Sequence, residues 1–248
     1  MEKGITVTLG ALLCVLLFSC NTQKDDEIEQ QLQTELAQKR VYQEEKEGRI
    51  SAYKDSLLAY EATISDESKY ELYDKLYKEY ILFKFDSAYF YPAKMKQIAI
   101  EMQSPHYLAD SRIKYCQALY NAGYYKEVID SLAIFKVESL THSAKDVSNY
   151  YFLYGRAYQM LAEHSMINEY SEKYNAIGNG FLQNALKFTD DSLMIYTIEA
   201  RIASRKMDYD NAKVYINKAI ACLVEYDDRA ASLYTMLAKI KGKEGNVQ

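Results

Sequence analysis

Residues 151–158 read Tyr-Phe-Leu-Tyr-Gly-Arg-Ala-Tyr, and this stretch decides the fold class. Tyr151, Tyr154 and Tyr158 recur at spacings of three and four, which place them on one face of an α-helix. Gly155 falls on the same face, where the absence of a side chain lets a neighbouring helix approach closely. The stretch therefore predicts a helix that packs against other helices through tyrosine rings and one glycine.

Two further stretches have the composition of short turns between helices. Residues 123–127 (Gly-Tyr-Tyr-Lys-Glu) and 207–212 (Met-Asp-Tyr-Asp-Asn-Ala) each separate two segments of helical periodicity. Corresponding first-helix positions then follow at spacings of 40, 39, 45 and 34 residues; they are Leu72, Arg112, Tyr151, Tyr196 and Ala230. The pattern predicts an all-α fold, a superhelical stack of antiparallel helix pairs, with a non-repeating helical bundle as the alternative.

Glycine and proline predict three local details of this stack. Pro92 falls inside a helix predicted over 86–103, which it should kink or start late. Ser104 and Pro105 are predicted as the N-cap and the first residue of the next helix. Residues 175–180 (Asn-Ala-Ile-Gly-Asn-Gly) are predicted as a loop before a helix that begins near Phe181, within the 45-residue interval.

Composition excludes several classes of protein. The chain has 248 residues, of which 9 are Gly and 2 are Pro, too few for the many turns of an all-β fold. Hydrophobic residues make up 49% of the chain, which argues against disorder. The formal net charge of −5 lacks the basic excess of a nucleic-acid-binding protein, so no nucleic acid is predicted as a partner.

The N-terminus has the features of a lipoprotein signal peptide. Residues 5–18 are apolar but, as a helix, span only about 21 Å, which is short of the hydrocarbon core of a bilayer. The run ends in Leu-Phe-Ser-Cys, which resembles a bacterial lipobox and implies acylation of Cys20 after removal of residues 1–19. An ordinary cleavage site beside an incidental cysteine is the alternative.

Residues 20–26 are then predicted to be a lipidated cysteine and an acidic tether. Lys24, Asp25 and Asp26 resemble the surface-export signal of Bacteroidetes lipoproteins, which implies outer-membrane attachment and exposure at the cell surface. The alternative is a solvated linker, and the sequence does not decide between a periplasmic and an external location. Residues 27–66 are rich in Glu, Gln and Lys and predict a long polar to amphipathic helical stalk before the repeats.

Residues 67–248 are predicted to form the repeat domain, in which the last repeat is incomplete. Aromatic-x-x-aromatic-Gly-x-x-Tyr at 151–158 and the helix-pair spacings resemble the tetratricopeptide repeat, whose consensus period is about 34 residues. Residues 46–57, 70–80 and 85–91 also resemble a family of Bacteroidetes sensory and regulatory proteins. In that family an extracytoplasmic tetratricopeptide region precedes a transmembrane helix and a cytoplasmic output segment, often DNA-binding.

The chain departs from that family because no membrane-spanning segment follows its repeats. We therefore expect either a stand-alone relative held by lipid or a truncated relative of a longer transmembrane regulator. We therefore do not extend the regulatory output function of that family to this chain.

No residue pattern predicts catalysis, so the chain is expected not to be an enzyme, and no catalytic residue, metal ligand or cofactor is assigned. The three histidines lack metal-ligand spacing, and the common phosphate-binding and nucleophile motifs are absent. Asp190 and Asp191 stand at a predicted helix start, where a carboxylate caps the helix. The chain has 25 Tyr and no Trp; helical spacing assigns most of these tyrosines to packing, with a glycan-binding platform as the alternative.

The first helices of such a stack face its concave side, and their polar residues are the candidate ligand contacts. These groove candidates are Asn149, Arg156, Gln159, Arg201, Ser204, Arg205 and Lys239. Four cations on one face of an acidic chain predict binding of an acidic or carboxylate-ended peptide, although arginines paired with neighbouring glutamates are the alternative. The expected function is a non-enzymatic, lipid-anchored scaffold for a protein or peptide at the cell envelope. A sensory or accessory module for nutrient uptake or regulation, which recognises a glycan or metabolite, is the alternative.

Overall fold

The computed structural model describes residues 39–59, 63–81, 84–139, 141–224 and 229–245. The chain divides into two compact units, Met1–Ala62 and Thr63–Gln248. The described part of the first unit is a helix over residues 39–59. The predicted signal peptide, Cys20, the residues of the export signal and the first part of the predicted stalk lie outside the described residues.

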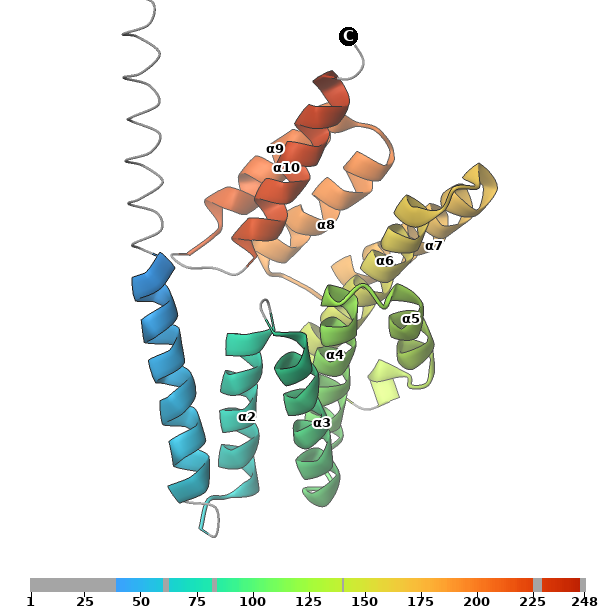
Figure 1. Cartoon of the computed structure of the whole chain (residues 1–248). Coiled ribbons are helices and arrows are strands. Elements are labelled where there is room, and N and C mark those ends of the chain that lie inside the picture. The colour runs from blue at the N-terminus through green and yellow to red at the C-terminus, as the bar shows by residue number, and fades with distance from the viewer. Residues whose placement is uncertain (1–38, 60–62, 82–83, 140, 225–228, 246–248) are drawn as a thin grey trace, which may run out of the picture. The chain divides into compact units, whose positions relative to one another are not determined.

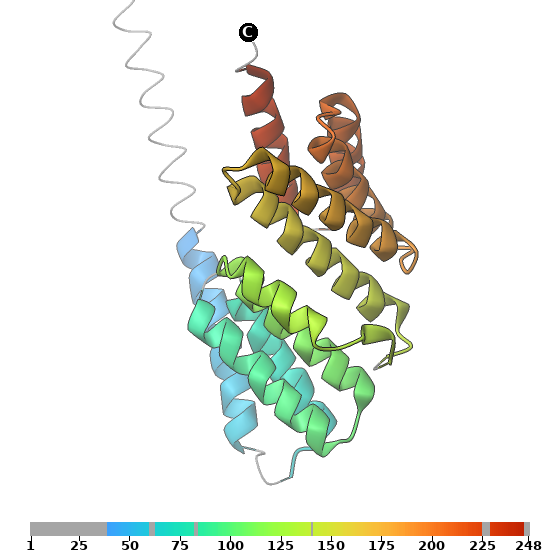
Figure 2. The same cartoon turned by 90° about the vertical axis from the view of Figure 1, so that its right-hand side faces the viewer.

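In the second unit the regular structure of the described residues is entirely helical (Figure 1). Its helices are α2 (Asp66–Tyr80), α3 (Phe85–Glu101), α4 (Pro105–Asn121), α5 (Tyr125–Ala133), α6 (Ala144–His164), α7 (Asn168–Leu186), α8 (Ser192–Arg205), α9 (Tyr209–Ala221) and α10 (Ala230–Gly245), with a 3-10 turn at Val137–Ser139. Each even-numbered helix up to α8 packs against the helix that follows it, and α10 packs against α9. Figure 2 shows the pairs following one another through the unit, which confirms the predicted stack of antiparallel helix pairs.

The turns between these helices form where the sequence predicts them. Ser104 accepts a hydrogen bond from the Tyr107 amide at the start of α4, and Pro105 is the first residue of that helix. Gly123 has a φ of 87° between α4 and α5, a conformation that glycine adopts without strain. Between α8 and α9, Asp208 caps α9 by accepting from the Asn211 amide.

The late helix start suggested by Pro92 is wrong, because α3 begins at Phe85 and continues through the proline. Proline in a helix interior removes one backbone hydrogen bond. Pro92 is itself buried, and Met95, Ile98 and Ala99 beyond it are also in the core. The burial of Pro92 and of the apolar residues after it therefore stabilises one continuous helix despite the lost hydrogen bond.

The loop predicted at residues 175–180 is also wrong, because α7 is continuous from Asn168 to Leu186. Gly178 is buried against Gly155 of α6, where the two backbones touch. A Cβ atom on Gly155 would lie 2.8 Å from the carbonyl oxygen of Gly178, and one on Gly178 would lie 2.8 Å from the carbonyl oxygen of Gly155. Gly178 therefore serves close helix packing rather than a turn, and α6 and α7 are simply longer than consensus repeat helices.

Tyrosine rings fill the spaces on either side of this backbone contact. The ring of Tyr154 stacks on Phe181 of α7 with a centroid distance of 4.1 Å, and Tyr158 stacks on the same ring at 5.8 Å. The buried Tyr150 hydroxyl donates to the Leu132 carbonyl oxygen of α5 at 3.0 Å. The predicted role of tyrosines as wedges between helices is confirmed for these residues.

None of the helices in the part of the chain that the structure describes combines the length and the apolar composition needed to cross a membrane.

We expect Gly155→Ala to lower the free energy of unfolding by about 1–3 kcal/mol, because its methyl group would overlap the backbone of α7. Gly180→Ala is the matched control, since Gly180 is exposed in α7 and a Cβ there would meet nothing within 4 Å. This control should raise the free energy of unfolding by about 0.5–1 kcal/mol through helix propensity. Urea unfolding followed by circular dichroism measures both, and equal effects of the two substitutions would contradict the proposed contact.

Candidate functional site

Two adjoining hollows lie along the first helices of the successive pairs. The smaller has a volume of about 320 Å³ and is lined from α4, α6, α8 and α10. The larger has a volume of about 660 Å³, extends to α2 and includes the α7–α8 connection. Arg156, Arg201 and Ser232 line both hollows, so together they form one groove with these three residues at its junction.

The structure brings the groove candidates of the sequence together in this groove. Six of them line the smaller hollow: Arg156, Gln159, Arg201, Ser204, Arg205 and Lys239. Asn149, two turns before Arg156 on α6, lines the larger hollow. Their role in binding remains a prediction.

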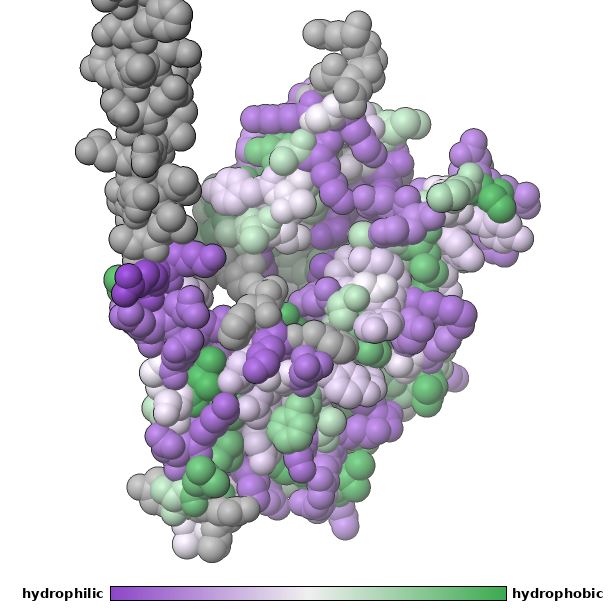
Figure 3. Space-filling view, viewed as in Figure 1, coloured by the Kyte–Doolittle hydropathy of each residue, from purple (hydrophilic) through white to green (hydrophobic). Residues whose placement is uncertain are grey.

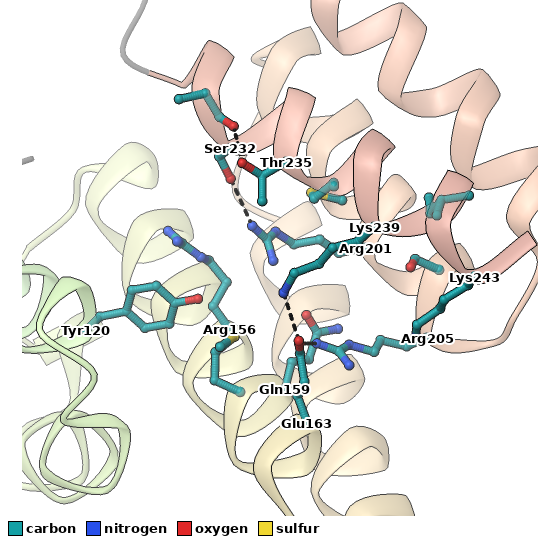
Figure 4. A pocket seen from close by; sticks show the side chains of 15 residues that line it. Tyr120, Arg156, Gln159, Glu163, Arg201, Arg205, Ser232, Thr235, Lys239 and Lys243 are labelled. Atoms are coloured by element: carbon teal, nitrogen blue, oxygen red, sulfur yellow. Dashed lines mark hydrogen bonds and ion pairs between the residues drawn. The ribbon is translucent and has the colours of Figure 1, made fainter. Parts of the chain in front are cut away.

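Aromatic rings hold the two arginines at the junction of the hollows. The guanidinium carbon of Arg156 lies 4.1 Å from the ring centroid of Tyr120 and 5.3 Å from that of Phe152. The guanidinium carbon of Arg201 also lies over the ring of Phe152, 5.8 Å from its centroid. Figure 4 shows Tyr120 and Arg156 on one side of the smaller hollow, with Arg201 directed toward Ser232 of α10. A cation over a ring face is attracted by the negative charge of that face, so these rings stabilise the two arginines without neutralising them.

The polar atoms of the junction have few partners within the chain. Arg201 donates from Nη2 to the Ser232 hydroxyl at 3.3 Å. The Nε atoms of Arg156 and Arg201 are buried without a hydrogen-bond partner, as is the side-chain oxygen of Gln159. Burial and the charge of Arg156 lower the pKa of Arg201 to about 10. Two arginine donors and one amide acceptor at or beside the junction are therefore left without a partner among the described residues.

One carboxylate occupies the outer part of the smaller hollow. Glu163 of α6 accepts from Arg205 of α8 and from Lys239 of α10, each at 2.8 Å (Figure 4). Burial would raise the pKa of Glu163, but the hydrogen bonds and charges of these two cations outweigh it and lower the pKa to about 2. The alternative of arginines paired with neighbouring glutamates thus holds for Arg205, whereas Arg156 and Arg201 form no ion pair within the described residues.

The smaller hollow is cationic although the chain is acidic. Its charged lining residues are five cations and one carboxylate: Arg156, Arg201, Arg205, Lys239 and Lys243 against Glu163. Burial alone would raise the pKa of the Tyr120 hydroxyl, but the charges of Arg156 and Arg201 lower it overall. Charge focused in a concave site of low dielectric attracts anions from a distance.

The far end of the larger hollow differs, because its charges are paired. Lys114 of α4 lies 2.7 Å from the carboxylate of Asp74 and 2.6 Å from that of Asp110. The hydroxyl of Tyr70 donates to Asp110 at 2.7 Å. Burial opposes the charged forms, but the pairing raises the pKa of Lys114 and lowers that of Asp74. This network joins α2 to α4 and pairs the cation at this end of the larger hollow with two carboxylates.

Several residues of the site were missed by sequence reasoning, above all Glu163, Tyr120 and Phe152. Glu163 follows Arg156 by seven residues and Gln159 by four, so helical spacing alone places it on the same face of α6. Phe152 precedes Arg156 by four residues on α6, so helical spacing places it beside Arg156 as well. Tyr120 carried no such signal, since its contact with Arg156 joins α4 to α6 and depends on the tertiary fold.

The ion pairs of Glu163 predict a pH-dependent stability. Because its pKa falls from 4.5 to about 2 on folding, its stabilising contribution is present above about pH 4.5 and is lost as the pH falls toward 2. We expect Glu163→Gln to lower the free energy of unfolding at pH 7 by about 1 kcal/mol or less, since the pair is partly exposed. The difference from the unmodified chain should shrink between pH 4.5 and 2 in urea unfolding. Glu172→Gln, at an exposed position of α7, is the control; a Glu163→Gln effect that does not change with pH would contradict the assignment.

Comparison with known proteins identifies the repeat family. The family model described as the SusR N-terminal TPR domain matches residues 36–248. No curated protein and no solved structure matches the chain. Tetratricopeptide (TPR) domains are in general non-catalytic scaffolds that bind proteins, and the match indicates no family of enzymes. The match covers most of the chain, including every helix of the groove, and the chain therefore belongs to the SusR N-terminal TPR domain family.

Proposed function

We propose that this chain is a non-enzymatic, lipid-anchored helical-repeat scaffold of the bacterial cell envelope, whose groove binds an acidic segment of a protein or peptide partner. The observation that carries the proposal is the excess of five cations over one carboxylate in the smaller hollow of an acidic chain. The family supports the general part of the proposal, since TPR domains commonly bind proteins.

An anionic partner is favoured by the chemistry of the groove. Arginine donates charge-assisted hydrogen bonds to carboxylates, each worth about 1.5–3 kcal/mol. Arg156 and Arg201 have no carboxylate of their own in the described chain, so a partner would supply the missing acceptors. The cationic field of the hollow would also hasten the encounter with an acidic segment.

Apolar contact contributes less to this proposal. Figure 3 shows hydrophilic and hydrophobic residues mixed over the face it presents, with no broad hydrophobic surface over the helix pairs. Large exposed side chains such as Met166 and Val224 lie far apart in the sequence, on separate connections between helices. We therefore expect binding through polar and charged groups, with a strong dependence on salt.

The anchor part of the proposal is supported by the sequence of the N-terminus. The apolar run at 5–18, Ser19 and Cys20 have the order of a lipoprotein signal, and Lys24, Asp25 and Asp26 follow at the position of a surface-export signal. Acyl chains on Cys20 would fix the protein to the outer membrane, and the polar residues that follow would separate the repeats from it.

Reversal of the groove charge tests the partner. We expect Arg201→Glu with Arg205→Glu to reduce capture of the envelope protein or peptide that the unmodified chain binds by at least tenfold, because two attractive charges become repulsive. Quantitative mass spectrometry of material captured from envelope extract measures this. Lys96→Glu with Lys126→Glu is the matched control, since both lysines are exposed on α3 and α5 and line neither hollow. Unchanged capture by the groove variant would end the groove proposal.

Two N-terminal variants test the proposed acylation and the proposed location at the cell surface. Cys20→Ser should abolish acylation and move the protein out of the membrane fraction, as mass spectrometry and fractionation would show. Replacement of Lys24, Asp25 and Asp26 by alanine should leave acylation intact but protect the repeat domain from protease added to whole cells. A mature protein with an unacylated amino end would contradict the anchor.

A sensory or accessory module that recognises a glycan or metabolite is the second candidate. It is favoured by membership of the SusR N-terminal TPR domain family and by the 320 Å³ hollow, whose size is in the range of small-molecule sites. Binding on a glycan array, with a change in tyrosine fluorescence that Arg201→Glu removes, would favour this candidate. Capture of one envelope protein without such binding would favour the scaffold.

A further inference from the structure

We propose that the tip of the α6–α7 hairpin, formed by Met166, Ile167 and Tyr170, inserts into the interfacial region of a neutral lipid bilayer. This inference rests on the anchor in the proposed function, because an anchor keeps the membrane close enough for a weak second contact to form. The polar residues after Cys20 set the limit of the distance between the repeats and the membrane. The tip would hold one edge of the repeat unit at the membrane surface within that limit.

The α6–α7 hairpin projects beyond its neighbours. α6 continues for 13 residues after Tyr151, whereas α4 and α8 end nine residues after the corresponding positions Arg112 and Tyr196. The additional four residues lengthen α6 by about 6 Å at the end that joins α7. Figure 1 shows the tip of this hairpin extending past the α4–α5 and α8–α9 turns. The tip is therefore placed to meet an opposing surface before these turns do.

The tip presents apolar side chains to solvent. Met166 is 100% exposed, Ile167 57% and Tyr170 47%. Figure 3 shows hydrophobic atoms at this tip with hydrophilic atoms around them. Three side chains are too few for a stable protein interface, which buries about 800 Å² on each partner. A bilayer adapts to the shape of a single projecting turn, so it suits this tip better than a preformed protein surface does.

Hydrogen bonds within the turn fix its backbone. Ser165 accepts from the Ile167 amide at 3.4 Å and donates to the Ile167 carbonyl oxygen at 3.1 Å. Ile167 is also the N-cap residue of α7 and makes no side-chain capping hydrogen bond, whereas Ser104 and Ser143 cap α4 and α6. An apolar N-cap lowers helix stability relative to Ser or Asp. The exposed isoleucine therefore does not serve the stability of α7, which favours a role in contact with another surface.

The order of side chains along the hairpin matches the polarity of a bilayer interface. Met166 and Ile167 stand at the end, and Tyr170 follows in the first turn of α7. Its ring combines an apolar body with a hydroxyl group, which suits the level of the lipid headgroups. The ring of Tyr170 lies 6.2 Å from that of Tyr174, which lies 6.1 Å from that of Tyr158 on α6. This row of rings supports the tip from within the hairpin.

Charged side chains near the tip favour a neutral bilayer over an anionic one. Glu169 and Glu172 are exposed in the first turns of α7, and Lys173 is exposed beside them. Two carboxylates and one ammonium group give no net attraction to anionic headgroups. Insertion would therefore depend on apolar contact and not on salt, in contrast to the salt-dependent binding expected of the groove.

A single tryptophan can report this contact, because the chain has no Trp of its own. The full chain carries Met166→Trp and is reconstituted through its acyl chains on vesicles of phosphatidylcholine with brominated acyl chains, which quench a tryptophan that inserts among them. Ile134→Trp is the matched control, since Ile134 is 82% exposed at the C-cap of α5. We expect quenching of Met166→Trp to be greater by about fivefold or more. The difference should persist between about 0.05 and 0.5 M NaCl.

A second reporter links the quenching to the apolar side chains of the tip. In a chain with Tyr170→Trp, the substitutions Met166→Ser and Ile167→Ser should reduce the quenching by about tenfold, because two exposed apolar side chains are lost. Ile134→Ser in the same reporter chain is the control and should leave the quenching unchanged. Circular dichroism verifies that each variant is folded.

Equal quenching of Met166→Trp and Ile134→Trp would overturn the proposal, as would quenching of Tyr170→Trp that the two serine substitutions do not reduce. Two results with aqueous iodide as the quencher would also overturn it. Shielding of Met166→Trp that rises with protein concentration in the absence of vesicles would assign the tip to a second copy of the chain. Shielding that requires an envelope protein would assign the tip to a protein partner.

The tip and the proposed function fail separately in these experiments. Mass spectrometry reports acylation of Cys20, and capture by the unmodified chain reports the groove. An acylated chain that captures its partner but shows no quenching at the tip overturns the lipid contact alone. If the chain is not acylated, the anchor is wrong, and the same quenching measured with an excess of added vesicles still decides whether the tip inserts.

Discussion

The backbone contact between Gly155 and Gly178 is the constraint on which the groove depends. Helices with side chains at a contact pack at 8–10 Å, whereas two facing glycines let their backbones meet. Because Gly155 is fixed against α7, the next residue, Arg156, is turned by about 100° and reaches the junction of the two hollows. The same contact brings Leu182 and Phe181 of α7 against α6, where the tyrosine rings complete the packing. Helix packing and groove chemistry are therefore set by consecutive residues of one helix.

The cations of the groove fall into two groups, one paired with a carboxylate and one in contact with aromatic rings. Glu163 satisfies the outer cations from α8 and α10, and it ties three successive first helices together through one carboxylate. The inner arginines are held by Tyr120 and Phe152, which stabilise a cation without neutralising it. The ion pairs of Glu163 thus join the helices of the groove, whereas the inner arginines have no carboxylate among the described residues.

The sequence predicted the order of the helices because periodicity and turn composition are local signals. The turns at Gly123 and Asp208 and the cap at Ser104 each depend on a few neighbouring residues. The loop at 175–180 failed for the opposite reason, since glycine marks both turns and close helix contacts, and only the partner helix distinguishes them. The periodicity of one helix could not reveal that Gly155 of α6 and Gly178 of α7 are in contact.

The sequence predicted which residues of the site share one face of a helix, because helical spacing depends on that helix alone. Alignment of the first helices identified the seven groove candidates, all of which line one of the two hollows. It could not show that Glu163 pairs with Arg205 and Lys239, that Tyr120 contacts Arg156, or that Phe152 contacts Arg201, because these contacts cross between repeats. The division between paired and unpaired cations is a property of the fold rather than of any segment.

The most direct test of this account is to record the side-chain Nε–H NMR signals of the arginines with and without an acidic peptide that supplies a carboxylate. The account predicts slow solvent exchange for Arg156 and Arg201 in the unliganded protein, since both Nε atoms are buried, and a downfield shift of these two signals when the carboxylate binds. Fast exchange of both signals, or a shift confined to Arg205, would contradict it.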